Sequence, residues 1–319
     1  GVIKDPAEIQ LVGHRLVHGG KTFTSPTIIT AEVKEKLTQT FPLAPLHNPP
    51  GYKGIEVAEK IFVKAIQIAV FDTAFHQTLP PEAYRYAIPE KYYSDNDIRV
   101  YGFHGTSHKY VSREAEKYLN IPNAKLISIH LGNGCSMCAI QNGKSIDTSM
   151  GFGPLCGLIM GTRSGDIDGT VIFYLMNQLG YNSEQVSNLL NKQSGMLGLT
   201  GFSDMRDITK AVHEGNPEAK LAYDMYAYRI KKYIGSYAAV LNGIDALIFT
   251  AGVGENDRML RELVCKDMDY LGILLNNEKN QDTVNVPRGI NQSNSPVKIL
   301  VIPTNEEVEI ANQCYHMIV

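Results

Sequence analysis

The chain has 319 residues, of which 44% are hydrophobic and 20% are charged, proportions that are usual for a globular protein. Its length exceeds what one hydrophobic core usually supports, so two domains are expected. The net charge of -3 lacks the basic surplus of nucleic-acid-binding proteins, and no apolar run is long enough to cross a bilayer. We therefore expect no nucleic acid and no membrane as partners. The opening at Gly1 shows no secretion signal and resembles the middle of a protein, which suggests that an upstream segment is absent.

The five cysteines are odd in number and scattered, which suits free thiols in a reducing compartment better than a disulfide framework. Cys135 and Cys138 form a CxxC, a spacing that can indicate metal or redox chemistry. The sequence holds no second CxxC pair, and the residues around this one alternate like a strand. We interpret both as buried thiols and expect a cytoplasmic protein.

In chain order, residues 8–18 predict a strand that ends in a polar tip. Residues 54–76 begin with helical spacing of apolar residues and finish in a β-like stretch, which places Asp72 near a strand end. A loop rich in proline and tyrosine follows over residues 79–93. Residues 125–140 predict two strands joined through an Asn-Gly turn, the strongest short hairpin signal.

The second half of the chain predicts mainly helices, over residues 169–180, 184–192, 205–213 and 216–242. Residues 245–256 predict a buried strand that enters a glycine-rich turn. Residues 298–318 predict a strand and then a helix, capped by Thr304 or Asn305, with Glu306 in its first turn. Because strands alternate with helices throughout, the fold class is α/β.

Several of the predicted strand ends carry polar residues into tight turns, where ligands bind in α/β folds. They include Arg15 with His14 and His18, Asp72, Asn133, and the stretch from Gly252 to Asn256. Arg163 lies in a glycine-flanked loop, and two arginines on one planar anion would form strong charge-assisted bonds. Taken singly, each of these residues fits an ordinary turn or surface position equally well.

The common nucleotide and metal motifs are not present. Gly143-Lys144-Ser145 resembles the end of a P-loop, but position 138 holds a cysteine where the leading glycine belongs. A phosphate grip would therefore need another glycine-rich design, for which the LGNG hairpin is suited. His104 with His108, and His14 with His18, have a metal-like spacing, but neither pair convincingly faces one way.

Eight segments together resemble the acetate kinase family, in its order and at its spacing along the whole chain. They are GHRLVHGG (13–20), LAPLHNPP (43–50), FDTAFHQTLP (71–80), YGFHGTSHKYV (101–111), HLGNGCS (130–136), DTSMGFGPLCGLIMGTRSGDID (147–168), FTAGVGEN (249–256) and IPTNEE (302–307). The resemblance implies a two-domain sugar kinase/Hsp70/actin-like (ribonuclease H-like) fold. It implies an incomplete first domain, because the family's first strand and its Asn-x-Gly-Ser-Ser-Ser turn have no counterpart here. The implied domains are residues 1–74 with 305–319, and residues 75–304.

The resemblance also implies an activity: reversible transfer of the ATP γ-phosphate to acetate, giving acetyl phosphate and ADP, with Mg²⁺ or Mn²⁺ as cofactor. Arg15 and Arg163 would bind the carboxylate and stabilise the phosphoryl group, and His104 would donate a hydrogen bond to it. Asp72 would orient the metal or an arginine, and Glu306 would hold the metal. His47 and His130 would be secondary contacts.

By the same resemblance, the ATP phosphates and adenosine would lie against His130, Leu131, Gly132, Asn133, Gly134, Asp204, Met205, Arg206, Gly252, Val253, Gly254, Glu255 and Asn256. Room at Gly252 argues for ATP rather than pyrophosphate as the donor. The acetate methyl would enter a pocket formed by Val17, Leu46, Phe103 and Pro154. Valine at position 17 leaves little space, so acetate is expected over propionate, with butyrate poor.

Three alternatives remain at this point. The chain could prefer propionate or butyrate, it could be a non-catalytic ATP-binding relative, or it could be a folded but inactive fragment. The presence of Arg15, Asp72, His104, Arg163 and Glu306 argues against a pure binder, which needs no transfer apparatus. By resemblance, a homodimer joined through the second domain is expected.

Overall fold

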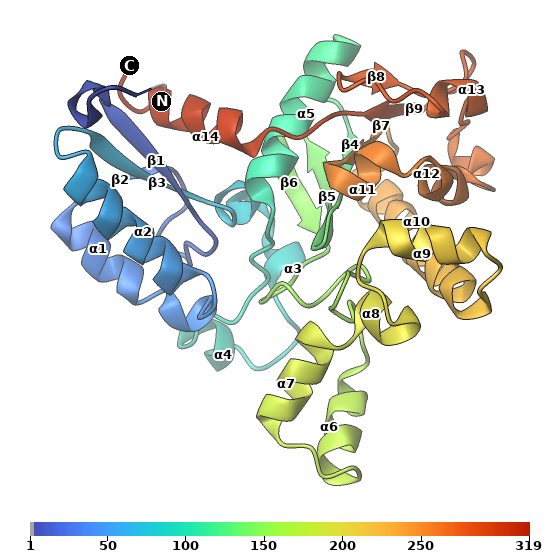
Figure 1. Ribbon diagram of the computed structural model, residues 1–319, viewed down its shortest axis with the longest axis horizontal. Coiled ribbons are helices and arrows are strands. Elements are labelled where there is room, and N and C mark those ends of the chain that lie inside the picture. The colour runs from blue at the N-terminus through green and yellow to red at the C-terminus, as the bar shows by residue number, and fades with distance from the viewer. Residues whose placement is uncertain (1–2) are drawn as a thin grey trace. The chain divides into compact units, whose positions relative to one another are not determined.

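The computed structural model describes residues 3–319 and divides into two compact units (Figure 1). The first comprises the residues up to Tyr110 together with Asn305–Val319, and the second comprises Val111–Thr304. This division by packing places its first boundary later than residue 74. The domains expected from the sequence stay a prediction, and residues 1 and 2 of the first lie outside the described part.

The first unit contains a three-stranded sheet in the order β1-β3-β2, formed by β1 (Leu11–Leu16), β3 (Ile66–Phe71) and β2 (Thr27–Ile28). β1 and β3 are parallel, in register from Leu11 opposite Ile66 to Leu16 opposite Phe71. β2 pairs with β3 in the antiparallel direction. The strands predicted before Arg15 and Asp72 are therefore confirmed. Because the two strands run in parallel, these two side chains come to the same edge of the sheet.

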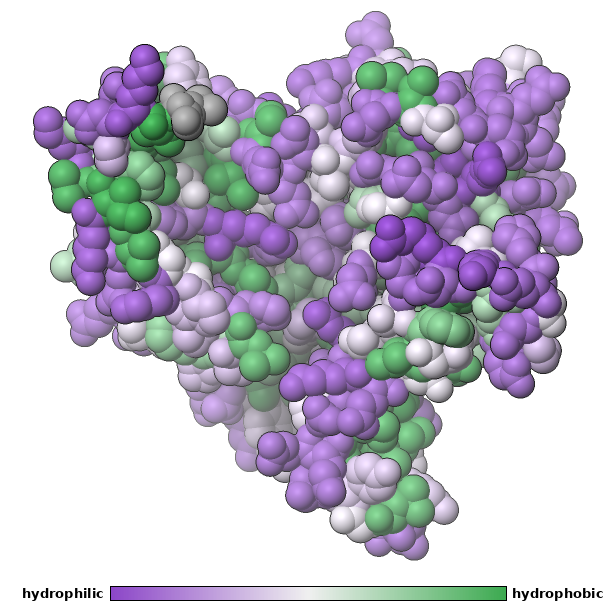
Figure 2. All heavy atoms as spheres, in the orientation of Figure 1, coloured by the Kyte–Doolittle hydropathy of each residue, from purple (hydrophilic) through white to green (hydrophobic). Residues whose placement is uncertain are grey.

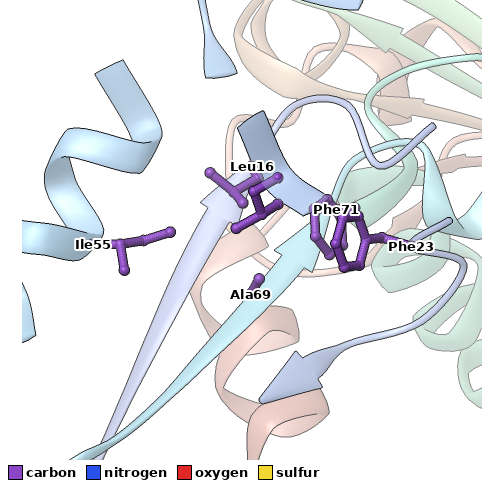
Figure 3. Close-up of a cluster of buried hydrophobic side chains, with 6 residues drawn as sticks. Leu16, Phe23, Ile55, Ala69 and Phe71 are labelled. Carbon is purple, nitrogen blue, oxygen red and sulfur yellow. The ribbon is translucent and has the colours of Figure 1, made fainter. Parts of the chain in front are cut away.

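Helices cover both faces of this sheet, and the side chains of β3 alternate between them with the two-residue period of a strand. Ala69 and Phe71 face α1 (Ala31–Thr38) and α2 (Asn48–Ile61), where Figure 3 shows Leu16, Phe23 and Ile55 packed around them. Ile68 and Val70 face α14 (Glu306–Tyr315) and its Cys314. Each of the buried Val, Leu, Ile and Phe side chains contributes roughly 1.5–3 kcal/mol of burial free energy. The core thus fixes the edge at which the polar residues lie.

The rest of the first unit consists of short elements. They are 3₁₀ turns at Pro6–Glu8, Phe41–Leu43 and Ala74–Thr78, and the helices α3 (Pro81–Tyr84) and α4 (Lys91–Ser94). α5 (Gly105–Leu119) begins in this unit and ends in the second. No helix was predicted from the sequence over the residues of α5.

The second unit is built on a six-stranded mixed sheet in the order β6-β5-β4-β7-β9-β8. Its strands are β4 (Leu126–Leu131), β5 (Cys135–Gln141), β6 (Lys144–Thr148), β7 (Ala246–Thr250), β8 (Arg288–Gly289) and β9 (Lys298–Val301). β4 and β5 form the predicted hairpin, while β4, β7 and β9 are mutually parallel. The tips of the hairpin and of β7 therefore lie next to each other.

The four predicted helices of the second unit are confirmed to within a few residues as α6 (Gly169–Asn177), α7 (Ser183–Lys192), α9 (Met205–His213) and α10 (Pro217–Leu241). Asn182, Asp204 and Asn216 cap the last three of these helices with their side chains. α10 packs against β5 and β6 and contacts α8, α9 and α12.

The remaining elements of this unit are α8 (Gly195–Thr200), α11 (Ala251–Asn256), α12 (Arg258–Cys265), α13 (Asn277–Asn280) and a 3₁₀ turn at Asp269–Leu271. The glycine-rich turn predicted after β7 is wrong in detail, because the chain enters α11 directly through Ala251 at a positive φ of 63°. Glycine normally argues against a helix, and tertiary packing overrides that preference here. Over residues 3–319, no helix has both the length and the apolar composition needed to cross a membrane.

Candidate functional site

Arg15 and Asp72 form an ion pair at the shared edge of β1 and β3. Arg15 Nη2 donates to Asp72 Oδ2 at 2.6 Å and Nε donates to Oδ1 at 3.0 Å, so the contact is bidentate. Burial by itself would lower the pKa of Arg15, but the hydrogen bonds and charge of Asp72, with the charge of Glu306, raise it above its ordinary value. Asp72 is 2% exposed and Arg15 is 42% exposed. The guanidinium is thus fixed in position while part of it stays accessible to a ligand.

The segment that carries His104 is attached to the same carboxylate residue. Gly105 N donates to the Asp72 carbonyl at 2.9 Å, and Thr106 Oγ1 donates to Asp72 Oδ1 at 3.1 Å. A Cβ at position 105 would lie 2.1 Å from the Asp72 carbonyl oxygen, so this approach requires glycine. His104 itself has a φ of 54°, in the left-handed region that non-glycine residues rarely adopt. Backbone strain of this kind concentrates at functional sites, which supports a role for His104.

Glu306 is the first residue of α14, and Asn305, one of the two predicted caps, begins the helix by accepting a hydrogen bond from Val308 N at 3.0 Å. Glu306 Oε2 lies 3.5 Å from Arg15 Nε. Burial raises the pKa of Glu306, Arg15 opposes that shift, and Asp72 adds to it. Arg15 therefore lies between two carboxylates.

Glu306 is the residue expected to hold a divalent cation, and that role stays a prediction. Both oxygens of Asp72 accept hydrogen bonds from Arg15, whereas Glu306 lies 3.5 Å from Arg15 Nε, so Glu306 is the less occupied of the two carboxylates. Over residues 3–319, no three His, Cys, Asp or Glu side chains form a ready-made cation site. Mg²⁺ usually keeps several waters and binds through one or two carboxylates and substrate phosphates, so a single glutamate is compatible with it.

The residues expected around the acetate methyl have different surroundings. Phe103 is 3% exposed and packs its ring edge-on against His18, whereas Leu46 is 71% exposed. Val17 follows β1 and is partly buried. Pro154 belongs to the second unit, where its carbonyl accepts a hydrogen bond from Arg163. Their grouping into one pocket stays a prediction.

The two histidines expected as secondary contacts also differ. His47 is exposed and occupies the position before α2, whereas His130 is 7% exposed within β4. Their roles toward a substrate stay predictions.

Arg163 differs from Arg15 in its partners. Its Nη1 donates to the Pro154 carbonyl at 3.1 Å and lies 3.7 Å from Met160 Sδ, both of which are neutral acceptors. Within the described residues, no carboxylate forms an ion pair with it, and burial lowers its pKa. A partly buried cation without a counter-charge is costly, and an anionic ligand would offset that cost.

The loop that carries Arg163 is closed by Asp166. Gly157 N donates to Asp166 Oδ1 at 2.6 Å, and the Tyr233 hydroxyl of α10 donates to Asp166 Oδ2 at 2.7 Å. Arg229, also on α10, donates to the Gly157 carbonyl at 2.9 Å. The long helix therefore holds the loop at both of its ends.

A cavity of about 930 Å³ lies in the second unit beside the β4–β5 hairpin and α9, α11 and α12, a volume suited to a nucleotide. Eight of the residues predicted to bind the nucleotide line it: Gly132, Asn133, Asp204, Met205, Arg206, Gly252, Val253 and Asn256. A Cβ at Gly252 would meet no atom within 4 Å, so this residue leaves space for a ligand.

The other residues predicted for the nucleotide are not in the lining of this cavity. They are His130 and Leu131 in β4, Gly134 in the turn, and Gly254 and Glu255 in α11. Glu255 Oε1 instead accepts a hydrogen bond from Thr304 N at 3.0 Å.

Part of the lining was not predicted from the sequence, namely Met160, Gly161, Met196, Ser203, Thr209, His213, Tyr226, Asp257, Arg258 and Met259. A signal existed for two of them. Thr209 and His213 follow Met205 at intervals of four, which places all three on one face of α9. The others come from segments that only the tertiary fold brings to the cavity.

The structure bears out the interpretation of the CxxC. All five cysteines are free, and Cys135 and Cys138 are both buried in β5. Three positions apart on a strand, they point to opposite faces of the sheet.

Comparison with known proteins agrees with this geometry. The chain matches the model of the acetokinase family over residues 1–312. It is 60% identical over 318 residues to the acetate kinase of Flavobacterium johnsoniae, an alignment covering 100% of this chain and 80% of that protein. The crystal structure of Porphyromonas gingivalis acetate kinase superposes with a TM-score of 0.96 at 46% identity, covering 100% and 81% of the two chains. A propionate kinase from Francisella tularensis superposes with a TM-score of 0.92 at 45% identity, covering 96% and 79%.

The fold is that of the sugar kinase/Hsp70/actin-like class, to which the acetate and propionate kinases among its structural neighbours belong. Within that class, the chain belongs to the acetokinase family.

Proposed function

We propose that this chain is a phosphotransferase with a carboxylate acceptor, which moves the γ-phosphate of ATP to acetate reversibly and gives acetyl phosphate and ADP. The observation that carries the proposal is 60% identity to an acetate kinase along the whole chain. The nucleotide-sized cavity of the second unit and the arginines of both units support it.

Phosphoryl transfer to acetate does not depend on a catalytic base. An acetate oxygen attacks the γ-phosphorus while the bond from that phosphorus to the bridging oxygen of ADP breaks. The acceptor is already an anion at neutral pH, so no proton must be removed. The obstacle is the repulsion between two anions, together with the charge on the equatorial phosphoryl oxygens. Fixed cations and hydrogen-bond donors are therefore the groups that such an enzyme needs.

We assign the residues of the first unit accordingly. Arg15, held by Asp72, binds the acetate carboxylate, and His104 donates a hydrogen bond to the transferring phosphoryl group. Glu306 holds Mg²⁺, with Mn²⁺ as a substitute, and a bound divalent ion would neutralise phosphate charge. The ion pair at 2.6 Å supports a positioning role for Asp72 toward Arg15.

In the second unit, we assign Arg163 to the carboxylate and the transferring phosphoryl group. Its neutral partners leave its positive charge for an incoming anion. The hairpin around Asn133 would contact the phosphates, and Asp204, Met205, Arg206 and the residues of α11 would surround adenosine.

We propose acetate as the preferred acceptor, with the methyl group against Val17, Leu46, Phe103 and Pro154. A single added methylene changes binding by only about 1–3 kcal/mol, so measurable propionate use is expected. Because the chain is 45% identical to a propionate kinase, its specificity constants for acetate, propionate and butyrate need to be compared. A higher specificity constant for propionate or butyrate than for acetate would contradict the assignment.

We further propose a cytoplasmic homodimer that associates through the second unit. In this unit α6 buries none of its side chains, and it exposes Phe173 at 63% and Tyr174 at 58%. Figure 2 shows apolar residues gathered around the α6–α7 end. Exposed apolar surface of this kind marks interaction sites. Light scattering at micromolar concentration should give twice the chain mass, and a monomer would contradict the proposal.

The direct test is hydroxylamine trapping of acetyl phosphate from the protein with Mg²⁺, ATP and acetate. Acetyl hydroxamate should form with the wild-type chain, and it should be absent with Arg163→Ala. Product formation equal in both proteins would contradict the role of Arg163. A folded wild-type protein that binds ATP without forming product would favour a non-catalytic nucleotide binder.

A further inference from the structure

A buried thiol lies directly behind the hairpin tip, which we define as Gly132, Asn133 and Gly134. Cys135 is the first residue of β5 and is 1% exposed. Burial raises the pKa of the thiol to about 11, so it remains protonated at physiological pH. In that form it offers one hydrogen-bond donor and one weak acceptor.

Both hydrogen-bonding capacities of this thiol are used. Cys135 Sγ donates to the Gly132 carbonyl at 3.2 Å, and it lies 3.0 Å from the Tyr226 hydroxyl. Because the thiol has a single hydrogen, the Tyr226 hydroxyl is the donor in the second contact. Tyr226 is on α10, is 1% exposed and lines the nucleotide cavity. The thiol therefore connects the hairpin tip to α10, whose Tyr226 lines the cavity.

The hydrogen bond from the thiol to the Gly132 carbonyl also determines where the Asn133 N–H points. Among the described residues all peptide bonds are trans, so the carbonyl of one residue and the N–H of the next point in opposite directions. Holding the Gly132 carbonyl toward Sγ makes the Asn133 N–H point away from the buried thiol. Within residues 3–319, that N–H donates no hydrogen bond.

The carbonyl of the next peptide, which joins Asn133 to Gly134, is also held by a hydrogen bond. Gly161 N donates to the Asn133 carbonyl at 3.1 Å, which turns the Gly134 N–H away from Gly161. A Cβ at position 161 would lie 2.3 Å from Asn133 Oδ1, so glycine is needed for this approach. Successive backbone N–H groups released in this manner form an anion-binding concavity.

We propose that Cys135 is a positioning residue for the nucleotide phosphates: its thiol holds the Gly132 carbonyl inward, so that the Asn133 N–H faces a phosphate oxygen. Without that anchor the peptide can rotate and present its carbonyl oxygen, which repels an anion. The inference rests on the proposed nucleotide binding, and it concerns the phosphates rather than the base.

Four variants separate this role from general packing. Cys135→Ala removes the donor, and Cys135→Ser keeps a donor and an acceptor at the same place. Tyr226→Phe removes the group that donates to the sulfur while keeping the ring in the cavity wall. Cys138→Ala is the matched control, because Cys138 is an equally buried thiol three residues along the same strand and outside the cavity lining.

The measurement is calorimetric titration of each variant with Mg-ADP and, separately, with adenosine, which has no phosphate. Cys135→Ala should weaken ADP binding about 10- to 150-fold, as expected for a lost hydrogen bond to a charged group. It should leave adenosine binding within about twofold. Cys135→Ser should recover most of the ADP affinity, Tyr226→Phe should show a smaller loss of it, and Cys138→Ala should match the wild type. In turnover, Cys135→Ala should raise the KM for ATP and leave the KM for acetate unchanged.

ADP binding by Cys135→Ala at wild-type affinity would overturn the inference. So would parallel losses for ADP and adenosine, because they indicate a disturbed cavity instead of misdirected phosphate donors. A wild-type protein that binds neither ligand would contradict the proposed function itself.

Discussion

The two arginines assigned to the reaction are held in opposite ways. Arg15 of the first unit contacts two carboxylates, with Asp72 at 2.6 Å and Glu306 at 3.5 Å. Arg163 of the second unit contacts a carbonyl and a thioether. The pKa of Arg15 is raised, chiefly because Asp72 outweighs the effect of burial, whereas burial lowers the pKa of Arg163.

The difference shows how one residue type can serve two purposes. The charge of Arg15 is compensated before any ligand arrives, so its contribution is a fixed geometry. The charge of Arg163 is not compensated, so its contribution is an electrostatic attraction that is satisfied only when an anion binds. The predictions below follow from that contrast.

The largest effect is expected at Arg163. Arg163→Ala should lower kcat/KM for acetyl phosphate formation by about 10³-fold or more, the range seen for arginines that neutralise a transferring phosphoryl group. Arg163→Lys should recover only part of the activity, since an ammonium cannot reproduce the planar guanidinium. Arg85→Ala is the control, because Arg85 pairs with Glu90 in the first unit and belongs to none of the assigned sites. A loss of less than tenfold for Arg163→Ala would remove it from the phosphoryl-transfer role.

A smaller effect is expected at Glu306, as a change in metal dependence. Glu306→Gln should lower kcat/KM by about 10²-fold at low Mg²⁺, with partial recovery as Mg²⁺ is raised, because it weakens one carboxylate contact to a hard cation. Glu307→Gln, at the exposed neighbouring position, should behave like the wild type. Wild-type dependence on Mg²⁺ in Glu306→Gln would contradict the assignment.

The same residue predicts a pH dependence of activity. Burial raises the pKa of Glu306 above its ordinary value, and only the ionised carboxylate binds a cation. As the solution is acidified, activity should therefore begin to fall at a higher pH than it would if Glu306 had the pKa of an ordinary glutamate. Rate–pH profiles of the wild type and Glu306→Gln, measured side by side, should show that acid limb in the wild type and not in the variant. An unchanged acid limb in Glu306→Gln would assign it to another group.

Two buried histidines of the first unit add a pH dependence of its stability. Burial lowers the pKa of His18 and of His76 to about 4. The unfolded value is about 6.5, so the unfolded chain binds protons that the folded chain excludes between these limits. The contribution of each neutral histidine to the free energy of unfolding is therefore complete above pH 6.5, and it is lost as the pH falls toward 4. Going from pH 7 to pH 5 should cost about 1–2 kcal/mol for each histidine.

Urea unfolding at several pH values checks this prediction. His18→Gln should lack one of the two contributions and so lose less stability between pH 7 and pH 5 than the wild type. If the variant and the wild type lost the same free energy of unfolding between pH 7 and pH 5, His18 would be able to take up a proton in the folded chain.

Much of the first unit could be predicted from local pattern. The strand that carries Arg15 and the strand that leads to Asp72 were predicted, but their parallel pairing, which brings the two side chains to one edge, is a tertiary feature that the structure shows. The left-handed conformation of His104 and the start of α5 could not be predicted. They depend on how closely Gly105 approaches the Asp72 carbonyl, which is a tertiary contact.

In the second unit the hairpin and the long helices were readable from turn signals and helical periodicity. The partners of Arg163 were not, because Pro154 and Met160 carry no pattern that marks them as acceptors. The wall of the cavity that includes Tyr226 also required the fold, since its ring is one of many apolar positions along α10.

The most direct test of the contrast between the arginines is the thermal unfolding of ligand-free Arg15→Met and Arg163→Met beside the wild type. Methionine keeps side-chain bulk and removes the charge in both. Arg15→Met leaves the buried Asp72 without its cation, so its midpoint should fall by about 5 °C. Arg163→Met removes an uncompensated charge, so its midpoint should equal or exceed that of the wild type although activity is lost. Equal losses of stability in the two variants would show that Arg163 is already compensated before an anion binds, and would contradict the account.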